Sequence, residues 1–289
     1  MQAYDKYEYE IQGTALTKYS GNKPQAVIPQ GVTQISYNAF SGCSGLVSVV
    51  IPDSVTQIGY SAFKGCTALE RVEIPQSVKA ICDDAFRGCG MLTGVVLPDG
   101  LTEIGRWAFT GCKSLTEIIL PSGLKKLGFS AFSGCENLKS VSMNCEIELI
   151  DDDVFSCCSS LEEAVIPQGV KSIGKWAFKG CNSLARVTLP DGLTAVADGA
   201  FKGCSALSGV TLPSGVQSIG EWAFAGCSAL GEITLPQSVG AIGMSAFSGC
   251  GSVTVNCEVK KPLFGLPKKW NKNWLGGSSS AKVVWNAKH

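Results

Sequence analysis

The sequence predicts a solenoid of ten stacked coils, with one parallel β-sheet face and a cap at each end. The first observation behind this prediction is a 23-residue period, because Val96–Ile118, VLPDGLTEIGRWAFTGCKSLTEI, recurs almost letter for letter along the chain. The second is that every copy keeps its apolar residues at the same places. A solenoid grows by stacking and needs no second core, so the 289 residues are expected to form one continuous domain.

The repeats occupy residues 27–255, and positions are numbered from the first residue of each repeat. The ten repeats begin at Val27, Val50, Glu73, Val96, Ile119, Ser142, Val165, Thr188, Thr211 and Thr234. Position 2 is Ile, Leu or Met, position 13 is almost always Ala, and position 14 is always Phe. Identical side chains at one position are therefore predicted to stack on the neighbouring coils as buried ladders.

Alternation, proline and glycine predict the local structure of each coil. Leu115–Leu120 alternates inward and outward side chains and is predicted to be a short strand, which Pro121 ends because proline has no N–H for a ladder. Strands one coil apart must pair in parallel. Trp107–Phe109, closed by Gly111, is predicted to be a short helical or 3₁₀ turn opposite the sheet. Positive φ is expected at Gly111 but is not required at Gly105, since other residues replace that glycine in four copies.

Both ends of the chain depart from the repeat and are predicted to be caps. Residues 1–26 contain two short strands joined through Gln12-Gly13, and residues 256–289 end in a strand at Lys282–Trp285. The C-terminal cap is basic, with lysines at Lys260, Lys261, Lys268, Lys269 and Lys272.

Repeat six, residues 142–164, is irregular. Asn144 replaces the usual proline, and several acidic residues follow. Its Met143–Ile147 segment, MNCEI, resembles Val255–Val259, VNCEV, at the end of the array. We interpret this repeat as a former terminal unit, so that the array is a fusion of two blocks.

Fourteen cysteines raise the question of disulfides, and their placement favours reduced thiols. One cysteine per repeat lies at position 17: Cys43, Cys66, Cys89, Cys112, Cys135, Cys158, Cys181, Cys204, Cys227 and Cys250. Stacked cysteines lie within bridging distance, but parallel Cβ vectors disfavour a bond, so these thiols are predicted to be small buried apolar groups. Cys157-Cys158, Cys82, Cys145 and Cys257 are expected to be the most exposed, although no basic residue is placed to activate them.

Catalytic and metal-binding motifs are missing from the sequence. The only histidine is His289, so a serine or cysteine nucleophile has no imidazole base, and no phosphate-binding glycine loop or CxxC pair occurs. We therefore expect no enzyme, no cofactor and no metal. The acidic run Asp151–Asp153 with Glu146 and Glu148 is a calcium candidate, but without calcium-loop spacing a solvated acidic edge is the preferred interpretation.

Charge and hydropathy limit the classes of partner. Lys plus Arg equals Asp plus Glu, 24 each, so no net charge attracts nucleic acid. No apolar run is long enough to span a membrane. Nothing in the sequence sets an oligomeric state, and a monomer is the expectation.

The outward residues of the sheet are the main candidate binding surface. Positions 22 and 1 give a partly apolar, β-branched stripe flanked by charges: Val50, Arg71, Glu73, Val96, Glu117, Ile119, Glu163, Val165, Arg186, Thr188, Thr211, Glu232 and Thr234. A stripe of this width suits a protein partner, although β-branched residues also simply suit strands.

A second candidate surface is an aromatic edge at positions 11 and 12. It consists of Tyr37, Tyr60, Trp107, Phe129, Trp176 and Trp222. Exposed aromatic clusters often mark binding sites. The preferred interpretation is nevertheless that each ring packs on the backbone of the next coil.

The signature IPxGVTxIGxxAFxGCxxLxxV, seen at Ile28–Val49 and Ile166–Val187, resembles the BspA-like leucine-rich repeat proteins. The resemblance covers Val27 to about Val255, and the tryptophans Trp270, Trp274 and Trp285 resemble the C-terminal cap of bacterial members. It implies a right-handed leucine-rich-repeat solenoid, display on or secretion from bacterial cells, and adhesion to a host matrix or cell-surface protein.

These observations predict a non-enzymatic interaction scaffold that binds a protein through the solenoid face, as a surface adhesion or recognition protein. The start of the chain, MQAYDKYEYEIQG, has neither the basic residues nor the apolar stretch of a signal peptide. The alternative is therefore a cytoplasmic protein-binding or effector module.

Overall fold

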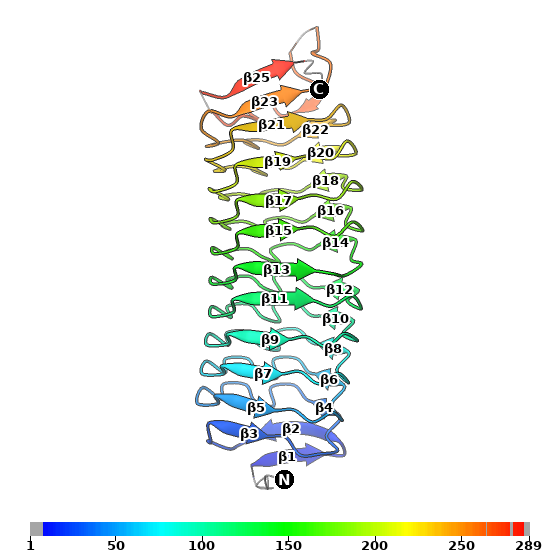
Figure 1. Cartoon of the computed structure of the whole chain (residues 1–289), viewed down its shortest axis with the longest axis vertical. Helices are drawn as coiled ribbons and strands as arrows, with labels where there is room; N and C mark the ends of the chain where they lie inside the picture. The colour runs from blue at the N-terminus through cyan, green and yellow to red at the C-terminus, as the bar shows by residue number, and fades with distance from the viewer. Residues whose placement is uncertain (1–7, 264, 278–279, 286–289) are drawn as a thin grey trace. The chain divides into compact units, whose positions relative to one another are not determined.

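The computed structural model describes residues 8–263, 265–277 and 280–285, in which all regular structure is β-strand (Figure 1). The chain divides into two compact units, Met1–Cys145 and Glu146–His289. Each unit is a parallel-strand β-solenoid, as predicted, and the boundary between the units falls inside the irregular repeat 142–164. That the chain forms one continuous domain stays a prediction. Sequence features at residues 1–7, 264, 278–279 and 286–289, His289 among them, lie outside the described residues.

In the first unit, each coil contributes a longer strand to one face and a two-residue strand to the other. The longer strands are β3 (Gln25–Val27), β5 (Ser48–Val50), β7 (Arg71–Glu73), β9 (Gly94–Val96), β11 (Glu117–Leu120) and β13 (Ser140–Met143). The shorter ones are β4 (Gln34–Ile35), β6 (Gln57–Ile58), β8 (Ala80–Ile81), β10 (Glu103–Ile104) and β12 (Lys126–Leu127). We call the outward surface of the longer strands the long-strand face.

The second unit repeats this arrangement. Its longer strands are β15 (Glu163–Val165), β17 (Arg186–Thr188), β19 (Gly209–Thr211), β21 (Glu232–Leu235), β23 (Thr254–Cys257) and β25 (Lys282–Trp285). Its shorter strands are β14 (Leu149–Ile150), β16 (Ser172–Ile173), β18 (Ala195–Val196), β20 (Ser218–Ile219), β22 (Ala241–Ile242) and β24 (Lys269–Trp270). The predicted final strand at Lys282–Trp285 is confirmed as β25, which pairs in parallel with β23.

The strand register equals the repeat length, so like residues face like residues. Ile118 of β11 pairs with Val141 of β13, and Ile104 of β10 pairs with Leu127 of β12. Both offsets are one 23-residue coil. This register stacks identical positions on each other and creates the predicted ladders.

Phenylalanines at position 14 form the centre of each unit's core. In the first unit, Phe40, Phe63, Phe86, Phe109 and Phe132 are fully buried and stack with ring centroids 4.8–5.2 Å apart. In the second unit, Phe155, Phe178, Phe201, Phe224 and Phe247 stack at 5.4–5.5 Å. Nearly parallel rings at this spacing are offset stacks, which add to the free energy gained from burial.

The prediction of a helical or 3₁₀ turn at Trp107–Phe109 was wrong. The segment is a series of turns, and its backbone N–H groups point alternately in two directions. The Phe109 N–H donates to the Ala131 carbonyl one coil away (2.8 Å), whereas the Cys112 N–H donates back to the Phe109 carbonyl (3.1 Å). A helix would direct every N–H along its own axis, so a helix cannot supply the bonds between coils. The two-residue strands form a second parallel ladder on this side of the coil.

Positive φ is found at the predicted glycine and also at a position that the sequence analysis missed. Gly111 has φ 72°, as expected, whereas Gly105 does not have positive φ. Position 12 also has positive φ, and there the residue is rarely glycine: Trp107 has φ 55° and Asp84 has φ 58°. Non-glycine residues in this region are strained.

Gly105 is needed for space. A Cβ at this site would lie 2.5 Å from both the backbone nitrogen and a carboxylate oxygen of Asp83 in the preceding coil. That oxygen, Asp83 Oδ1, accepts a hydrogen bond from the Arg106 N–H (2.7 Å). The same contact recurs one coil apart at Asp152 with Lys175 and at Asp198 with Glu221.

The cysteine ladder is buried as predicted, apart from the half-buried Cys43, and all fourteen cysteines are free thiols. Eight of the buried ladder thiols also donate a hydrogen bond to a backbone carbonyl. The Cys66 Sγ donates to the Phe40 carbonyl of the preceding coil (3.1 Å), and Cys112 bonds Phe86 in the same way (3.3 Å). The thiol thus occupies the second lone pair of a carbonyl that already accepts a turn hydrogen bond.

Both caps cover the open ends of their units with aromatic rings. The predicted pair of N-terminal strands is confirmed as β1 (Tyr9–Gln12) antiparallel to β2 (Ala15–Tyr19). Tyr19 stacks on Phe40 at 4.9 Å. At the other end, Trp274 meets Phe247 edge-on at 5.7 Å. Each ladder of rings therefore ends on a capping aromatic residue.

We predict that Gly105→Ala lowers the free energy of unfolding by about 1–3 kcal/mol, because the added methyl group overlaps the Asp83 backbone. Urea denaturation followed by circular dichroism measures the change. Gly45→Ala is the matched control, since a Cβ there has no atom within 4 Å, and it should shift the stability by less than about 0.5 kcal/mol. Equal losses in the two variants would show that the tight contact is not what requires Gly105.

We also predict that the fold loses stability in alkaline solution. The ordinary cysteine pKa is 9.0, and burial raises the pKa of Cys89 to about 12. Below pH 9 the Cys89 thiol is protonated in both the folded and the unfolded chain, and its full contribution to the free energy of unfolding is present. Above pH 9 the unfolded chain releases protons that the folded chain retains. Each such thiol then lowers the free energy of unfolding by about 1.4 kcal/mol per pH unit.

Urea midpoints at pH 7, 9 and 10 test this alkaline loss. Cys89→Ala should be less stable than the wild-type chain at pH 7 but show a shallower decline above pH 9. A decline as steep as that of the wild-type chain would show that the buried thiol is not responsible.

Candidate interaction face

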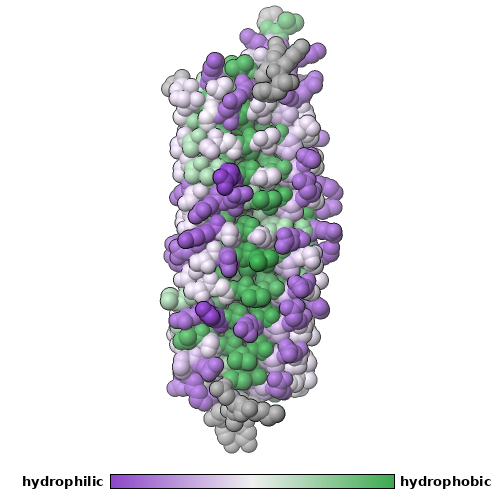
Figure 2. Space-filling view, viewed as in Figure 1, coloured by the Kyte–Doolittle hydropathy of each residue, from purple (hydrophilic) through white to green (hydrophobic). Residues whose placement is uncertain are grey.

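The long-strand face of the first unit exposes large apolar side chains. In β9 and β11 the second residue points into the core, and the residues on either side of it point outward. Val96 is 70 % exposed and Ile119 is 60 % exposed. Figure 2 shows hydrophobic residues gathered along the middle of the long-strand face, with hydrophilic residues at its edges. Val50 belongs to the same stripe, whereas Glu73 interrupts it with a charge.

The predicted site residues of this face all lie at its surface. Twelve are exposed: Val50, Arg71, Glu73, Val96, Glu117, Ile119, Glu163, Val165, Arg186, Thr188, Thr211 and Glu232. Thr234 is half-buried. The outward alternation was thus predicted correctly, while a binding role for these residues stays a prediction.

A hollow of about 460 Å³ opens in the face of the first unit, above Gly94. Val96 and Ile119 line its walls together with Glu117, and Asn144 lies at its end. The hollow forms where position 22 carries no side chain. The hydrogen-bonded sheet is also interrupted here, because β9 ends one sheet and β11 begins another.

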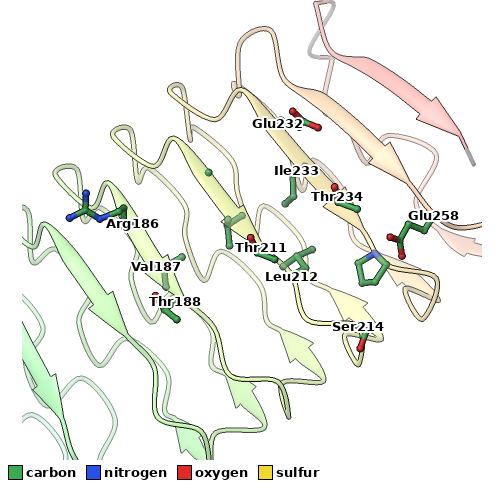
Figure 3. A pocket seen from close by; sticks show the side chains of 13 residues that line it. Arg186, Val187, Thr188, Thr211, Leu212, Ser214, Glu232, Ile233, Thr234 and Glu258 are labelled. Atoms are coloured by element: carbon green, nitrogen blue, oxygen red, sulfur yellow. The ribbon is translucent and has the colours of Figure 1, made fainter. Parts of the chain in front are cut away.

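A second hollow, of about 600 Å³, opens in the face of the second unit above Gly209. Figure 3 shows Thr188, Thr211 and Thr234 on successive strands, with Glu258 beyond the strand ends. The ladder is weak here as well, since β17 and β19 share only one registered pair. Glycine inside a strand commonly marks a place where another molecule approaches closely.

The two hollows occupy equivalent places in their units but differ in chemistry. Gly94 and Gly209 both lie at position 22, and each is followed one coil later by a glutamate. The walls are Val96 and Ile119 in the first unit, but Thr211 and Thr234 in the second. One fold therefore presents an apolar hollow and a hydroxyl-lined hollow.

Charged residues at the hollow of the second unit are held by neighbours. The Arg186 guanidinium donates to a Glu163 carboxylate oxygen at 2.9 Å. The Glu232 carboxylate accepts a hydrogen bond from the Asn256 side chain. These contacts fix charges of both signs at the rim, although exposed pairs of this kind add little stability.

Among the lining residues that the sequence analysis did not name as site residues are Gly94, Gly209, Asn144 and Glu258. The two glycines have no side chain that could indicate a binding site in the sequence. Asn144 and Glu258 take the place of the usual proline, and their N–H groups donate to the preceding coil (3.3 and 3.0 Å). The replacement of the usual proline by a polar residue was the feature of the sequence that could have indicated the end of each hollow.

A family model described as BspA type leucine rich repeat region (6 copies) matches residues 11–139, 79–208 and 148–261. Together these matches span most of the chain. The chain belongs to the BspA type leucine-rich repeat family. The resemblance inferred from the repeat signature is thereby confirmed.

Solved structures of bacterial leucine-rich repeat proteins share this BspA type fold. A protein from Bacteroides ovatus is 24% identical, with a TM-score of 0.71 over 96% of this chain and 88% of its own. The T. pallidum leucine-rich repeat protein is 31% identical, with a TM-score of 0.55 over 71% and 91%. The pneumococcal vaccine antigen PcpA is 18% identical, with a TM-score of 0.54 over 92% and 80%. Among curated proteins, none matches the sequence.

The aromatic edge of this BspA type protein is divided between exposed and packed rings. Tyr37 and Tyr60 are 67 % and 56 % exposed. Trp176 lies over Gly199 of the next coil, where a Cβ would be 2.3 Å from its ring. Trp107 meets Phe129 edge-on at 5.4 Å. The expected packing on the next coil thus holds for Trp176.

Trp222, the remaining member of the aromatic edge, is half-buried. It accepts the Lys202 ammonium group over its ring, 5.2 Å from the centroid.

The acidic run of repeat six is used for contacts within the second unit. Asp152 accepts a hydrogen bond from the Lys175 N–H (2.6 Å), and Glu148 pairs with Lys171 (3.0 Å). The described residues contain no group of three or more His, Cys, Asp or Glu that could hold a metal ion. In the same part of the chain, no helix has the length and apolar content of a membrane span.

Among the cysteines singled out from the sequence, only Cys157 is exposed. The expectation for Cys82, Cys145, Cys158 and Cys257 was wrong, because all four are buried. Burial raises the pKa of Cys257 to about 12. Cys157 occupies position 16, where the other copies have glycine, and has φ 60°.

We predict that one thiol per native molecule reacts quickly with a maleimide at pH 7, and that this thiol is Cys157. Buried thiols lack access and stay protonated. Mass spectrometry of the labelled protein measures the count, and Cys157→Ser should remove the fast reaction while leaving full labelling in urea. Rapid native labelling of several ladder cysteines would contradict this assignment.

Proposed function

We propose that this protein is a non-enzymatic scaffold that binds a protein partner through its long-strand face. The observation that carries the proposal is the apolar hollow of the first unit, where Val96 and Ile119 expose most of their surface beside Gly94. Contiguous exposed apolar surface that is rimmed by charge is typical of protein interaction sites.

The rest of the face supports the same use. Glu117 lies at one edge of the apolar hollow, so the rim is polar and the centre apolar, as in protein interfaces. The hollow is built on β9 and β11, which are held by pairing with β7 and β13, and not on a flexible loop. A partner would therefore bind a surface that is already ordered, and little backbone entropy would be lost.

The hollows of the two units suit different chemical groups. The first unit offers Val96 and Ile119 to an apolar side chain. The second offers the hydroxyl groups of Thr211 and Thr234, with Arg186 and Glu258 of opposite charge nearby. We propose the apolar hollow as the anchor and the hydroxyl-lined hollow as a site of polar contacts. The aromatic edge is the second candidate surface.

We further propose that the protein acts outside the cell, as an adhesion or recognition protein of a bacterial surface. Membership of the BspA type family and the fold shared with a pneumococcal vaccine antigen support this location. The alternative is an intracellular protein-binding module, which the many free thiols favour. In both cases the protein is proposed to act as a monomer.

We predict that the double variant Val96→Asp/Ile119→Asp lowers partner binding at least about tenfold, because two charges would be desolvated in an apolar contact. Immobilised wild-type and variant chains are compared for every protein they retain from an extracellular-matrix extract and from a cytoplasmic extract. Quantitative mass spectrometry identifies the retained proteins, and the extract that supplies the affected partner separates the two proposed locations.

Met91→Asp is the matched control, since Met91 is 51 % exposed and lies outside the long-strand face. It should leave the retained proteins unchanged. Circular dichroism melts confirm that all variants fold. A folded double variant that retains the same proteins in the same amounts would exclude the long-strand face as the binding surface. Trp176→Asn, at a positive-φ position that asparagine tolerates, then tests the aromatic edge.

A further inference from the structure

The connection that leads into the C-terminal cap is longer than the connections between the coils. In the preceding coil, five residues, 236–240, join β21 to β22. In the cap, eleven residues, 258–268, join β23 to β24. The strands at both ends of this connection still pair in parallel with the preceding coil, since Leu235 pairs with Cys257 and Ile242 pairs with Trp270. The cap connection is therefore six residues longer, and its described residues 260, 261, 263, 265 and 268 are exposed.

Both ends of this loop are firmly held. At one end the Glu258 N–H donates to the Leu235 carbonyl at 3.0 Å. At the other end Trp270 is buried, stacks on Trp285 at 5.6 Å and meets Trp274 edge-on at 5.3 Å. The loop is thus presented by a rigid aromatic base.

The cap loop has a pair of lysines and a proline on each side of an apolar centre. Lys260-Lys261-Pro262 precedes an apolar centre and Pro267-Lys268-Lys269 follows it. Within the described part of that centre, Leu263 is 96 % exposed, more than any other large apolar residue described in the structure. All four lysines are exposed. An apolar tip between two pairs of lysines has no packing role in the solenoid.

Charge is distributed very unevenly along the chain. Residues 259–289 contain seven lysines and no Asp or Glu, a net charge of +7. Because the whole chain is neutral, the remaining residues carry a net charge of −7. An anionic surface would therefore attract the cap and repel the rest of the molecule.

We propose that the cap loop is a docking site for an anionic phospholipid bilayer. The lysine pairs contact the headgroups, and Leu263 inserts its side chain among them. Charge complementarity would suit any polyanion, but the almost fully exposed Leu263 beside four lysines favours lipid, which offers both anionic groups and apolar surface. This site is separate from the long-strand face and does not depend on the proposed function.

Co-sedimentation with vesicles of phosphatidylcholine containing 30 mol % phosphatidylglycerol tests the proposal, with pure phosphatidylcholine as the neutral surface. The full chain should bind the anionic vesicles, and binding should weaken in high salt. Lys260→Gln/Lys261→Gln/Lys268→Gln/Lys269→Gln should weaken binding by several hundredfold, at about fivefold per lysine. Leu263→Ser should weaken it by about tenfold.

The control pair Lys79→Gln/Lys139→Gln removes exposed lysines from the first unit and should leave vesicle binding unchanged. Tryptophan fluorescence of each cap variant shows whether the aromatic base is intact. Val96→Asp/Ile119→Asp should bind vesicles normally, which separates this proposal from the interaction face.

Two results would overturn the lipid proposal. One is equal binding to neutral and anionic vesicles. The other is tight binding to soluble polyphosphate that needs the lysines, together with vesicle binding that Leu263→Ser does not affect. The second result would assign the loop to anionic polymers instead of a bilayer.

Discussion

Hydrogen bonds between successive coils are the constraint on which each unit depends. They run through both strand ladders and also through the turns, where the Phe109 N–H donates to the next coil. A coil can satisfy its backbone only if its neighbour has the same path through space. The path in turn requires left-handed residues at Trp107 and Gly111 and an open space at Gly105. Repetition of the sequence is the chemical consequence of this requirement.

Because the interior is fixed by stacking, variation collects on the outside of the coil. Position 23 is buried in the long strands from β5 to β21, while positions 22 and 1 lie on the outside and carry Val, Ile, Thr, Ser, Arg, Glu or Gly. Removing one side chain, as at Gly94, opens a hollow without disturbing the core beneath it. Gly209 opens a second hollow in the same way, but threonines line it in place of Val96 and Ile119. One scaffold therefore carries two chemically different surfaces.

Periodicity predicted the core, the strands and the outward alternation, because each depends on which residues recur. The strands at both ends of the chain were predicted from the loss of that periodicity. The turn at Trp107–Phe109 could not be predicted in the same way, since its N–H groups bond the next coil and not the local chain. The burial of Cys82 was missed because this residue replaces the position-10 glycine and so lies outside the cysteine ladder. The hollows were not predicted, because each lies above a glycine, and a residue without a side chain gives no chemical indication of a site.

The cysteine ladder determines which thiols can be chemically modified when a unit partly unfolds. Each ladder thiol is shielded by the coils on either side, so its protection belongs to the stack. Cys43, in the first coil, is the half-buried member of the ladder, whereas Cys112 is fully covered. If a unit frays from one end, its thiols become reactive in sequence order. The positions of the modified cysteines would therefore show how many coils of a unit have unfolded and from which end.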